Sequence, residues 1–137
     1  MLETMEIIDY NSIETQGFLN IKEVLDANTD IKVTSSFSKN SDIPIIVLSI
    51  QKTPVSTKFN NKHIAEVQVN VRCLNKTKLS ADLLTKSITD IIYNNIDELS
   101  AYGLQYKEYR SLPIDFERGN QRIHGTDLVY IFWYKWK

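Results

Sequence analysis

The side chains that most often perform chemistry in proteins are few and scattered in this sequence. The 137 residues include two histidines, His63 and His124, and one cysteine, Cys73. A zinc site needs three or four ligands, and His124 has only Asp127 close to it along the chain. Cys73 is in register with a series of alternating valines, which favours a buried, inert thiol over a nucleophile. We therefore expect neither a metal centre nor a catalytic cysteine.

Motifs for phosphate binding and acyl transfer are also missing from the sequence. The four glycines lie too far apart for the dinucleotide-binding or P-loop spacing. No serine is flanked by glycines as in a nucleophile elbow. Neighbouring carboxylates, such as Asp115 and Glu117, lie in polar segments where such groups are ordinarily solvated. The sequence thus predicts a protein that is not an enzyme and that uses no cofactor.

Two segments that we expect to be loops carry basic side chains, and the first also carries an aromatic ring. The residues are Lys52, Lys58, Phe59, Lys62, Arg118 and Arg122. A positive groove with aromatic side chains can hold single-stranded nucleic acid. The same residues on a subunit surface would instead contact neighbouring proteins. We treat these six as candidate assembly contacts and keep a small nucleic-acid-binding module as an alternative.

The composition is that of one globular domain spanning residues 1–137. Hydrophobic residues make up 42% and charged residues 24% of the chain, which excludes a disordered tail. A net charge of −1 gives no general attraction to nucleic acid or anionic lipid. The first 56 residues hold four basic and eight acidic side chains, a net of −4, and the remainder holds twelve and nine, a net of +3. This polarity could align subunits head to tail.

The N-terminal segment does not have the pattern of a secretory signal. Met1–Tyr10 carries three acidic residues, without a basic beginning and an apolar middle. The apolar stretch around Pro44–Leu48 is far shorter than the ~20 residues of a membrane helix. We expect a chain that is intracellular at synthesis, does not contact membrane and keeps Cys73 reduced.

Hydrophobic periodicity in the first half of the chain predicts one helix and three strands. Helical spacing covers Ile13–Leu25, and a short strand is expected at Ile31–Val33. Pro44–Ile50 is rich in β-branched residues, as strands are. A long polar loop, Gln51–His63, is expected before Ile64–Leu74, where apolar and polar residues alternate.

The second half predicts a long amphipathic helix and a strand hairpin. The helix spans about Leu79–Leu99, and strands span about Leu104–Ile114 and Asp127–Trp136. Between these strands lies a polar loop, Asp115–Thr126, with Gly119, Asn120 and Gly125 as turn signals. The elements predict an α+β fold: a mainly antiparallel sheet of four or five strands, the long helix packed on one face, and an N-terminal helix.

This order of elements resembles the tail terminator proteins of long-tailed bacteriophages, also called tail completion or tail-to-head joining proteins. In that family an early helix is followed by a polar stretch and a proline that lead into an apolar strand, here Asp42–Val47. A long loop leads to an alternating strand, here His63–Leu74. A central amphipathic helix follows at about Leu79–Leu99, and the last strand is aromatic, here Leu128–Trp136.

The resemblance implies a structural virion role without catalysis or a cofactor. Terminators of this kind form a ring, usually a hexamer, at the head-proximal end of the tail and join the tail to the head. The implied partners are further copies of the chain, the tail tube protein, neck or connector proteins, and DNA in the lumen. The implied location is the virion, after assembly in the host cytoplasm. A head-side neck protein, a stopper or an adaptor, is the alternative structural role.

Two long loops are expected to reach neighbouring proteins in such a ring. These are Gln51–Lys62, which we expect to be mobile until assembly, and Asp115–Thr126.

Overall fold

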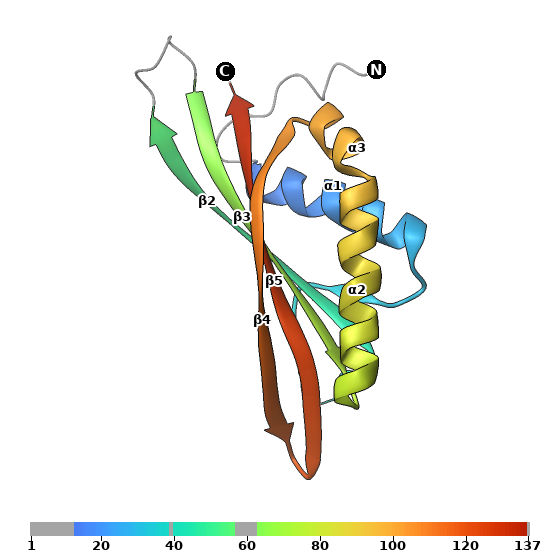
Figure 1. Cartoon of the computed structure of the whole chain (residues 1–137). Coiled ribbons are helices and arrows are strands. Elements are labelled where there is room, and N and C mark those ends of the chain that lie inside the picture. Colours follow the sequence, from blue (N-terminus) through green and yellow to red (C-terminus); the bar gives the residue numbers. More distant parts are fainter. Residues whose placement is uncertain (1–12, 39, 57–62, 137) are drawn as a thin grey trace.

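The computed structural model describes residues 13–38, 40–56 and 63–136, which form a five-stranded sheet with helices packed against it (Figure 1). The predicted α+β class is therefore confirmed. The elements are α1 (Ile13–Asn28), β1 (Val33–Thr34), β2 (Ile45–Ser56), β3 (His63–Asn75), α2 (Lys78–Asn94), α3 (Ile96–Ala101), β4 (Leu104–Arg118) and β5 (Gln121–Trp136).

The sheet has the strand order β1-β2-β3-β5-β4 and is mixed. The pairs β2–β3, β3–β5 and β5–β4 are antiparallel, whereas β1 runs parallel to β2. The parallel pair arises because the segment after Thr34 carries the chain back, so that Val33 lies opposite Ile46. The prediction of a mainly antiparallel sheet is corrected to a mixed one.

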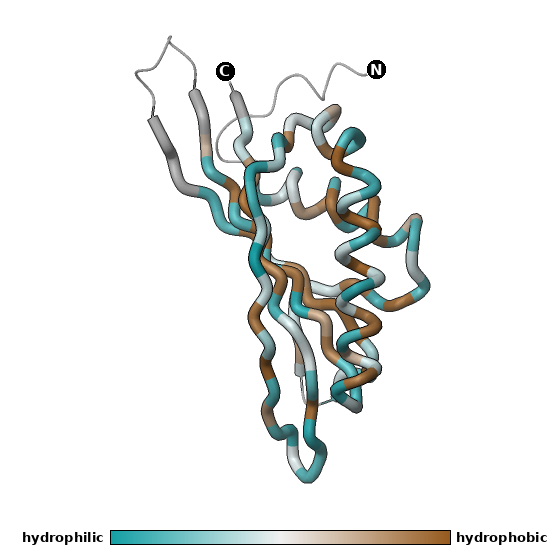
Figure 2. Tube along the Cα trace, in the orientation of Figure 1, coloured by the Kyte–Doolittle hydropathy of each residue, from teal (hydrophilic) through white to brown (hydrophobic). Residues whose placement is uncertain are grey.

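The main core lies between the sheet and the helices. The alternating positions Val67, Val69 and Val71 of β3 are buried, as their period of two predicts. Ile88 of α2 and Phe132 of β5 belong to the same cluster. Figure 2 shows the hydrophobic positions gathered in the central strands and recurring along α2, while the turn of the β4–β5 hairpin is hydrophilic.

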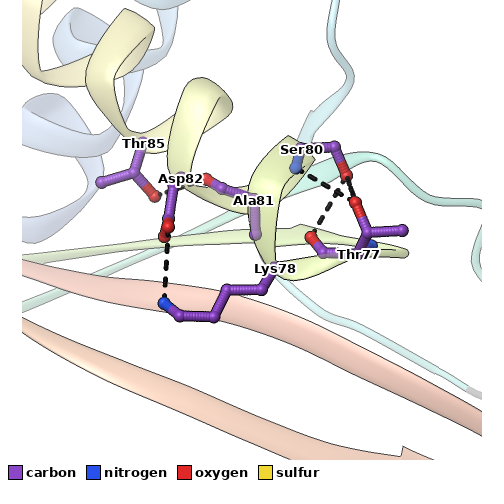
Figure 3. Close-up of polar contacts among 6 residues, drawn as sticks. All are labelled: Thr77, Lys78, Ser80, Ala81, Asp82 and Thr85. Carbon is purple, nitrogen blue, oxygen red and sulfur yellow. Dashed lines mark hydrogen bonds and ion pairs between the residues drawn. The ribbon is translucent and has the colours of Figure 1, made fainter.

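Helix α2 begins at a capping box (Figure 3). The hydroxyl of Thr77 accepts a hydrogen bond from the backbone N–H of Ser80 at 3.1 Å. The hydroxyl of Ser80 in turn accepts one from the N–H of Thr77 at 3.3 Å. The two side chains satisfy donors that a helix start leaves without intrahelical partners. This reciprocal arrangement fixes the first turn of α2 beside the sheet.

The predicted single helix Leu79–Leu99 is wrong in its length, because the chain forms two shorter helices. Asn95, at φ −117°, leaves helical geometry between α2 and α3. Its side chain donates to the carbonyl of Ile91 at 2.7 Å, and its backbone N–H donates to Ile92 at 3.1 Å. Asparagine competes for backbone hydrogen bonds in this way, which ends α2 although the apolar spacing continues.

Both predicted long loops are partly strands. Gln51–Ser56 extends β2 and pairs with β3, and His63 begins β3, so these parts of the predicted Gln51–His63 loop are strands; residues 57–62 lie outside the described residues. The predicted Asp115–Thr126 loop is wrong, because β4 and β5 pair up to Arg118 and Gln121. The chain turns at Gly119 and Asn120, where Gly119 adopts a left-handed φ of +64°.

A second, smaller core explains why this hairpin continues. Ile114 and Phe116 of β4 pack with the buried Ile123 of β5. The connection between β1 and β2 adds Phe37, whose ring meets that of Phe116 edge-on with centroids 6.0 Å apart. Ile45, in the same cluster, alternates in β2 with Ile46 of the main core. The smaller core therefore lies on the opposite face of the sheet.

Candidate assembly surfaces

Strand β4 forms one edge of the sheet and is exposed over residues 107–113. Among the described strands it pairs with β5 alone, so one row of its backbone N–H and C=O groups has no strand beside it. Two apolar side chains are also exposed on it, Tyr109 at 46% and Leu112 at 54%. A long open edge with apolar side chains is a surface on which another chain can add a strand.

The opposite edge is also incompletely covered. Strand β1 pairs only with Ile46 and Val47, so β2 beyond Val47 has no described strand on its outer side. A groove of about 390 Å³ lies between this part of β2 and α1, and its apolar walls include Phe18 and Ile50. The exposed Leu19 lies on its α1 side. The two edges of the sheet therefore present different surfaces.

The β4–β5 hairpin extends past the first turn of α2 (Figure 1). Arg118 anchors its end, donating to the backbone carbonyls of Ser38 at 3.1 Å and Ser41 at 2.6 Å. The guanidinium also lies 4.8 Å from the centre of the Phe37 ring. A guanidinium has several fixed donors and a flat face, so it can bind carbonyls and stack on a ring together. This predicted contact residue thus holds the β1–β2 connection against the hairpin.

Arg122, the other predicted contact residue of the hairpin, forms ion pairs along it. Its guanidinium lies 3.0 Å from a carboxylate oxygen of Asp115 and 3.5 Å from one of Glu117. These groups are exposed, and such pairs contribute little to stability. They do neutralise the positive charge locally, which weakens the attraction of this segment for nucleic acid.

Of the candidate contacts in the first expected loop, the structure describes Lys52 alone. Its backbone N–H donates to the carboxylate of Glu14 at 3.2 Å, and its ammonium lies 3.9 Å from the same carboxylate. Lys58, Phe59 and Lys62 lie outside the described residues. Lys52 contacts α1 through Glu14, whereas Arg118 and Arg122 flank the hairpin turn, so the structure does not bring Lys52 together with these two arginines.

Among the residues considered for catalysis, Cys73 is enclosed, whereas His124 and Asp115 line one small cavity. Cys73 is fully buried, and burial raises the pKa of its thiol to about 12. His124 lines a small cavity of about 250 Å³ with Lys78, Asp82 and Asp115. Among residues 13–38, 40–56 and 63–136, no group of three or more potential ligands could hold a metal ion.

A cavity of about 340 Å³ between the helices and the hairpin is not foreseen from the sequence. We call it the tyrosine cavity; it is lined by Thr89, Asp90, Ile92, Tyr93, Ile96, Tyr106, Tyr109 and Tyr130. Tyr106 and Tyr109 reach the same face although they are three residues apart, because a bulge falls between Tyr106 and Glu108. The tyrosine content near Tyr106 is visible in the sequence, but strict alternation would place these two rings on opposite faces.

Comparison with known proteins shows a likeness in structure and none in sequence. No protein-family model matches the chain, and no curated protein matches it in sequence. Its structure is similar to a chain in the virion of a native gene transfer agent particle, with a TM-score of 0.52 and 11% identity. The match covers 93% of this chain and 99% of that chain. At this identity the likeness shows a shared fold.

One further finding concerns the helices. In the described part of the chain, none of them is long and apolar enough to cross a membrane.

Proposed function

We propose that this chain is a structural protein of a phage-like virion, and more specifically a tail terminator that forms a ring at the head-proximal end of the tail and joins it to the head. The observation that carries the virion role is the shared fold with a gene transfer agent virion chain, which spans nearly the whole of both chains. The finer assignment rests on the element order, which resembles that of phage tail terminators.

The two edges of the sheet support ring formation. One edge is β4 with its exposed Tyr109 and Leu112, and the other is β2 with the groove beside α1. Contacts between unlike surfaces are heterologous, and they close into rings when the rotation between subunits permits it. A hexamer is the ring that the resemblance favours. In it, β4 of one subunit would face the β2 edge of the next.

The proposed partners outside the ring are the tail tube protein on one side and neck or connector proteins on the other. The hairpin that ends at Gly119 is a suitable contact element, because Arg118 and Phe37 fix its end against the body of the subunit. DNA would pass through the lumen. The chain would assemble in the host cytoplasm and remain in the virion, and it would have no enzymatic activity.

Electron cryo-microscopy of particles that contain this chain tests the proposal. We expect several copies around the tail axis, between the tail tube and the head, with the β4–β5 hairpin reaching a neighbouring protein. Copies bound on the head side of the neck would indicate that the chain is a stopper or adaptor and not a terminator. A single off-axis copy, or no copy in the virion, would contradict the structural role.

The alternative is a nucleic-acid-binding module, which would depend on the lysines between Lys52 and Lys62. Among the basic candidates that the structure describes, Lys52 contacts Glu14 and Arg122 contacts Asp115. These contacts reduce the charge available for phosphates. Affinity for DNA that falls steeply with salt would favour this alternative, whereas absence of DNA binding at low salt would exclude it.

A further inference from the structure

The tyrosine cavity combines aromatic walls with one acidic group. Its volume of about 340 Å³ is at the lower end of the ~300–1,000 Å³ typical of small-molecule sites. Tyr93 and Tyr109 are exposed, whereas Tyr130 is 3% exposed. The rings of Tyr109 and Tyr130 are stacked at a centroid distance of 5.2 Å. The cavity is therefore open to a partner on one side and enclosed by packed aromatic rings on the other.

The hydroxyl of Tyr130 is buried without a hydrogen-bond partner in the described part of the chain. Thr89 lies beside it, but the Thr89 hydroxyl donates its proton to the carbonyl of Thr85 at 2.8 Å. A buried polar group without a partner costs about 1–3 kcal/mol. Burial also raises the pKa of Tyr130, so the phenol stays neutral near neutral pH. Such a hydroxyl can accept a hydrogen bond from a group that enters the cavity.

The charge of the cavity selects the kind of group that can enter. Asp90 is the one charged side chain among the described residues that line it. Its carboxylate pairs with Lys86 at 3.0 Å, but both side chains are more than half exposed. An exposed pair of this kind contributes little, so Asp90 can accept another cation at small cost. The ring faces of tyrosines also attract cations.

We propose that the tyrosine cavity receives an arginine side chain from a neighbouring protein of different sequence. A guanidinium carries five N–H donors and no acceptor, and its flat face stacks on aromatic rings. It would donate to the carboxylate of Asp90 and to the hydroxyl of Tyr130, and it would lie against Tyr93 and Tyr109. This inference rests on the proposed function only for the existence of a neighbour.

The chain's own arginines are poor candidates for this role. Arg72 is held by Asp127 through two hydrogen bonds of 3.0 Å, and Arg118 and Arg122 are bound within the subunit. Arg110 follows Tyr109 directly in β4 and therefore faces the other side of the sheet. Three of the four arginines are thus engaged within their own subunit, and the fourth, Arg110, lies in a groove with the acidic Glu66 and Glu108, which favours a different protein as the donor.

Nuclear magnetic resonance titration of the full chain with N-acetyl-arginine amide tests the inference. We expect saturable shifts at residues that line the cavity. The uncharged analogue N-acetyl-citrulline amide should bind roughly 2- to 30-fold more weakly, the range of cation–π interactions. Asp90→Asn and Tyr130→Phe should each weaken arginine binding, and Leu112→Ala, in β4 outside the cavity, should leave it unchanged.

Three results would overturn the inference. They are equal binding of the arginine and citrulline amides, shifts that lie outside the cavity, and full binding in the Asp90→Asn variant. A dimer in solution that Asp90→Asn dissociates would show that a second copy fills the cavity, and this too would contradict the proposed partner. Because the titration uses the free chain, its failure would leave the ring proposal standing, and failure of the imaging test would leave arginine binding intact.

Discussion

At the scale of single residues, Cys73 shows how packing determines chemistry. Its alternation with valines predicts burial, and its side chain is indeed enclosed under α2. Removing a thiolate from water is unfavourable, so burial raises the pKa of the thiol from 9.0 to about 12. The folded chain therefore keeps a proton that the unfolded chain loses as the pH rises above 9.

This difference predicts that the chain becomes less stable in mild alkali. The stabilisation is fully present below about pH 9 and is lost as the pH rises toward 12, by about 1.4 kcal/mol per pH unit for one proton. Urea unfolding at pH 8, 9 and 10 should show the fall, although other groups also titrate in this range. The Cys73→Ala variant should show a smaller slope, and an equal slope in both proteins would contradict the assignment.

Ile88 provides a test of the main core. It is fully buried in α2 against the sheet. Ile88→Asp would place a charge there without a partner, which costs about 3–5 kcal/mol. This is a large part of the stability of a domain, so we expect the variant to unfold in circular dichroism and thermal melts. Leu83→Asp, on the exposed face of the same helix, should fold normally; unfolding of both variants would argue against this packing.

At the scale of elements, periodicity locates the helices and strands but does not locate their ends. Ile13, Ile64 and Leu74 lie within one residue of observed strand or helix bounds. The end of α2 is not predicted because the apolar spacing continues through Asn95, where local hydrogen bonds to Ile91 and Ile92 decide the outcome. The hydrophobic pattern of the sequence indicates which face of the helix is buried. It does not indicate which side chains compete for the backbone hydrogen bonds of the helix.

The length of the β4–β5 hairpin is not predicted from the sequence for a different reason. Gly125 suggests a turn, yet it lies within β5, where a Cβ would collide with the carbonyl of Cys73 in the neighbouring strand. Glycine is used here for close approach and not for a turn. The polar residues around Phe116 belong to paired strands, because the second core covers their apolar neighbours.

The turn of the hairpin gives a matched pair of variants. Gly119 has a φ of +64°, and a Cβ at this position would lie more than 4 Å from every atom beyond its chain neighbours, so a substitution there acts chiefly through backbone strain. Gly119→Val should lower the free energy of unfolding by about 1–2 kcal/mol, because β-branched residues rarely adopt this conformation. Gly119→Asn should be nearly neutral, since asparagine tolerates it. Chemical denaturation of both variants measures the difference, and equal stability would contradict the turn geometry.

At the scale of the whole molecule, the surfaces are harder to predict than the fold. The parallel pairing of β1 involves only Val33 and Thr34, too short a segment for a pattern to reveal its direction. The tyrosine cavity depends on the bulge beside Lys107 and on helices that are distant in sequence. Charge and loop position single out Arg118 and Arg122 as candidate contacts, and the structure shows that both have partners within the subunit.

The proposed ring predicts that edge strand β4 is needed for assembly and not for folding. Leu112 is exposed on this strand and lies opposite Asp127 of β5, so Leu112→Lys places a positive charge on the edge beside an acidic neighbour. Lysine on an edge strand discourages pairing with another chain, so the variant should fold as well as the original but fail to add to a ring. The measurement is the fraction of tails joined to heads, counted by electron microscopy in particles made with each variant.

A second variant with an added lysine distinguishes an effect at the β4 edge from an effect of charge elsewhere on the surface. Leu83→Lys makes the same exchange at an exposed position of α2 that lines none of the cavities described against β4 or β2, and it should leave joining unchanged. If Leu112→Lys joined tails to heads as well as the original chain, β4 would not be a subunit contact. If both variants failed equally while remaining folded, the defect would lie in net charge. Loss confined to Leu112→Lys is the outcome that a ring closed through unlike sheet edges requires, because only there would the added charge face a neighbouring strand.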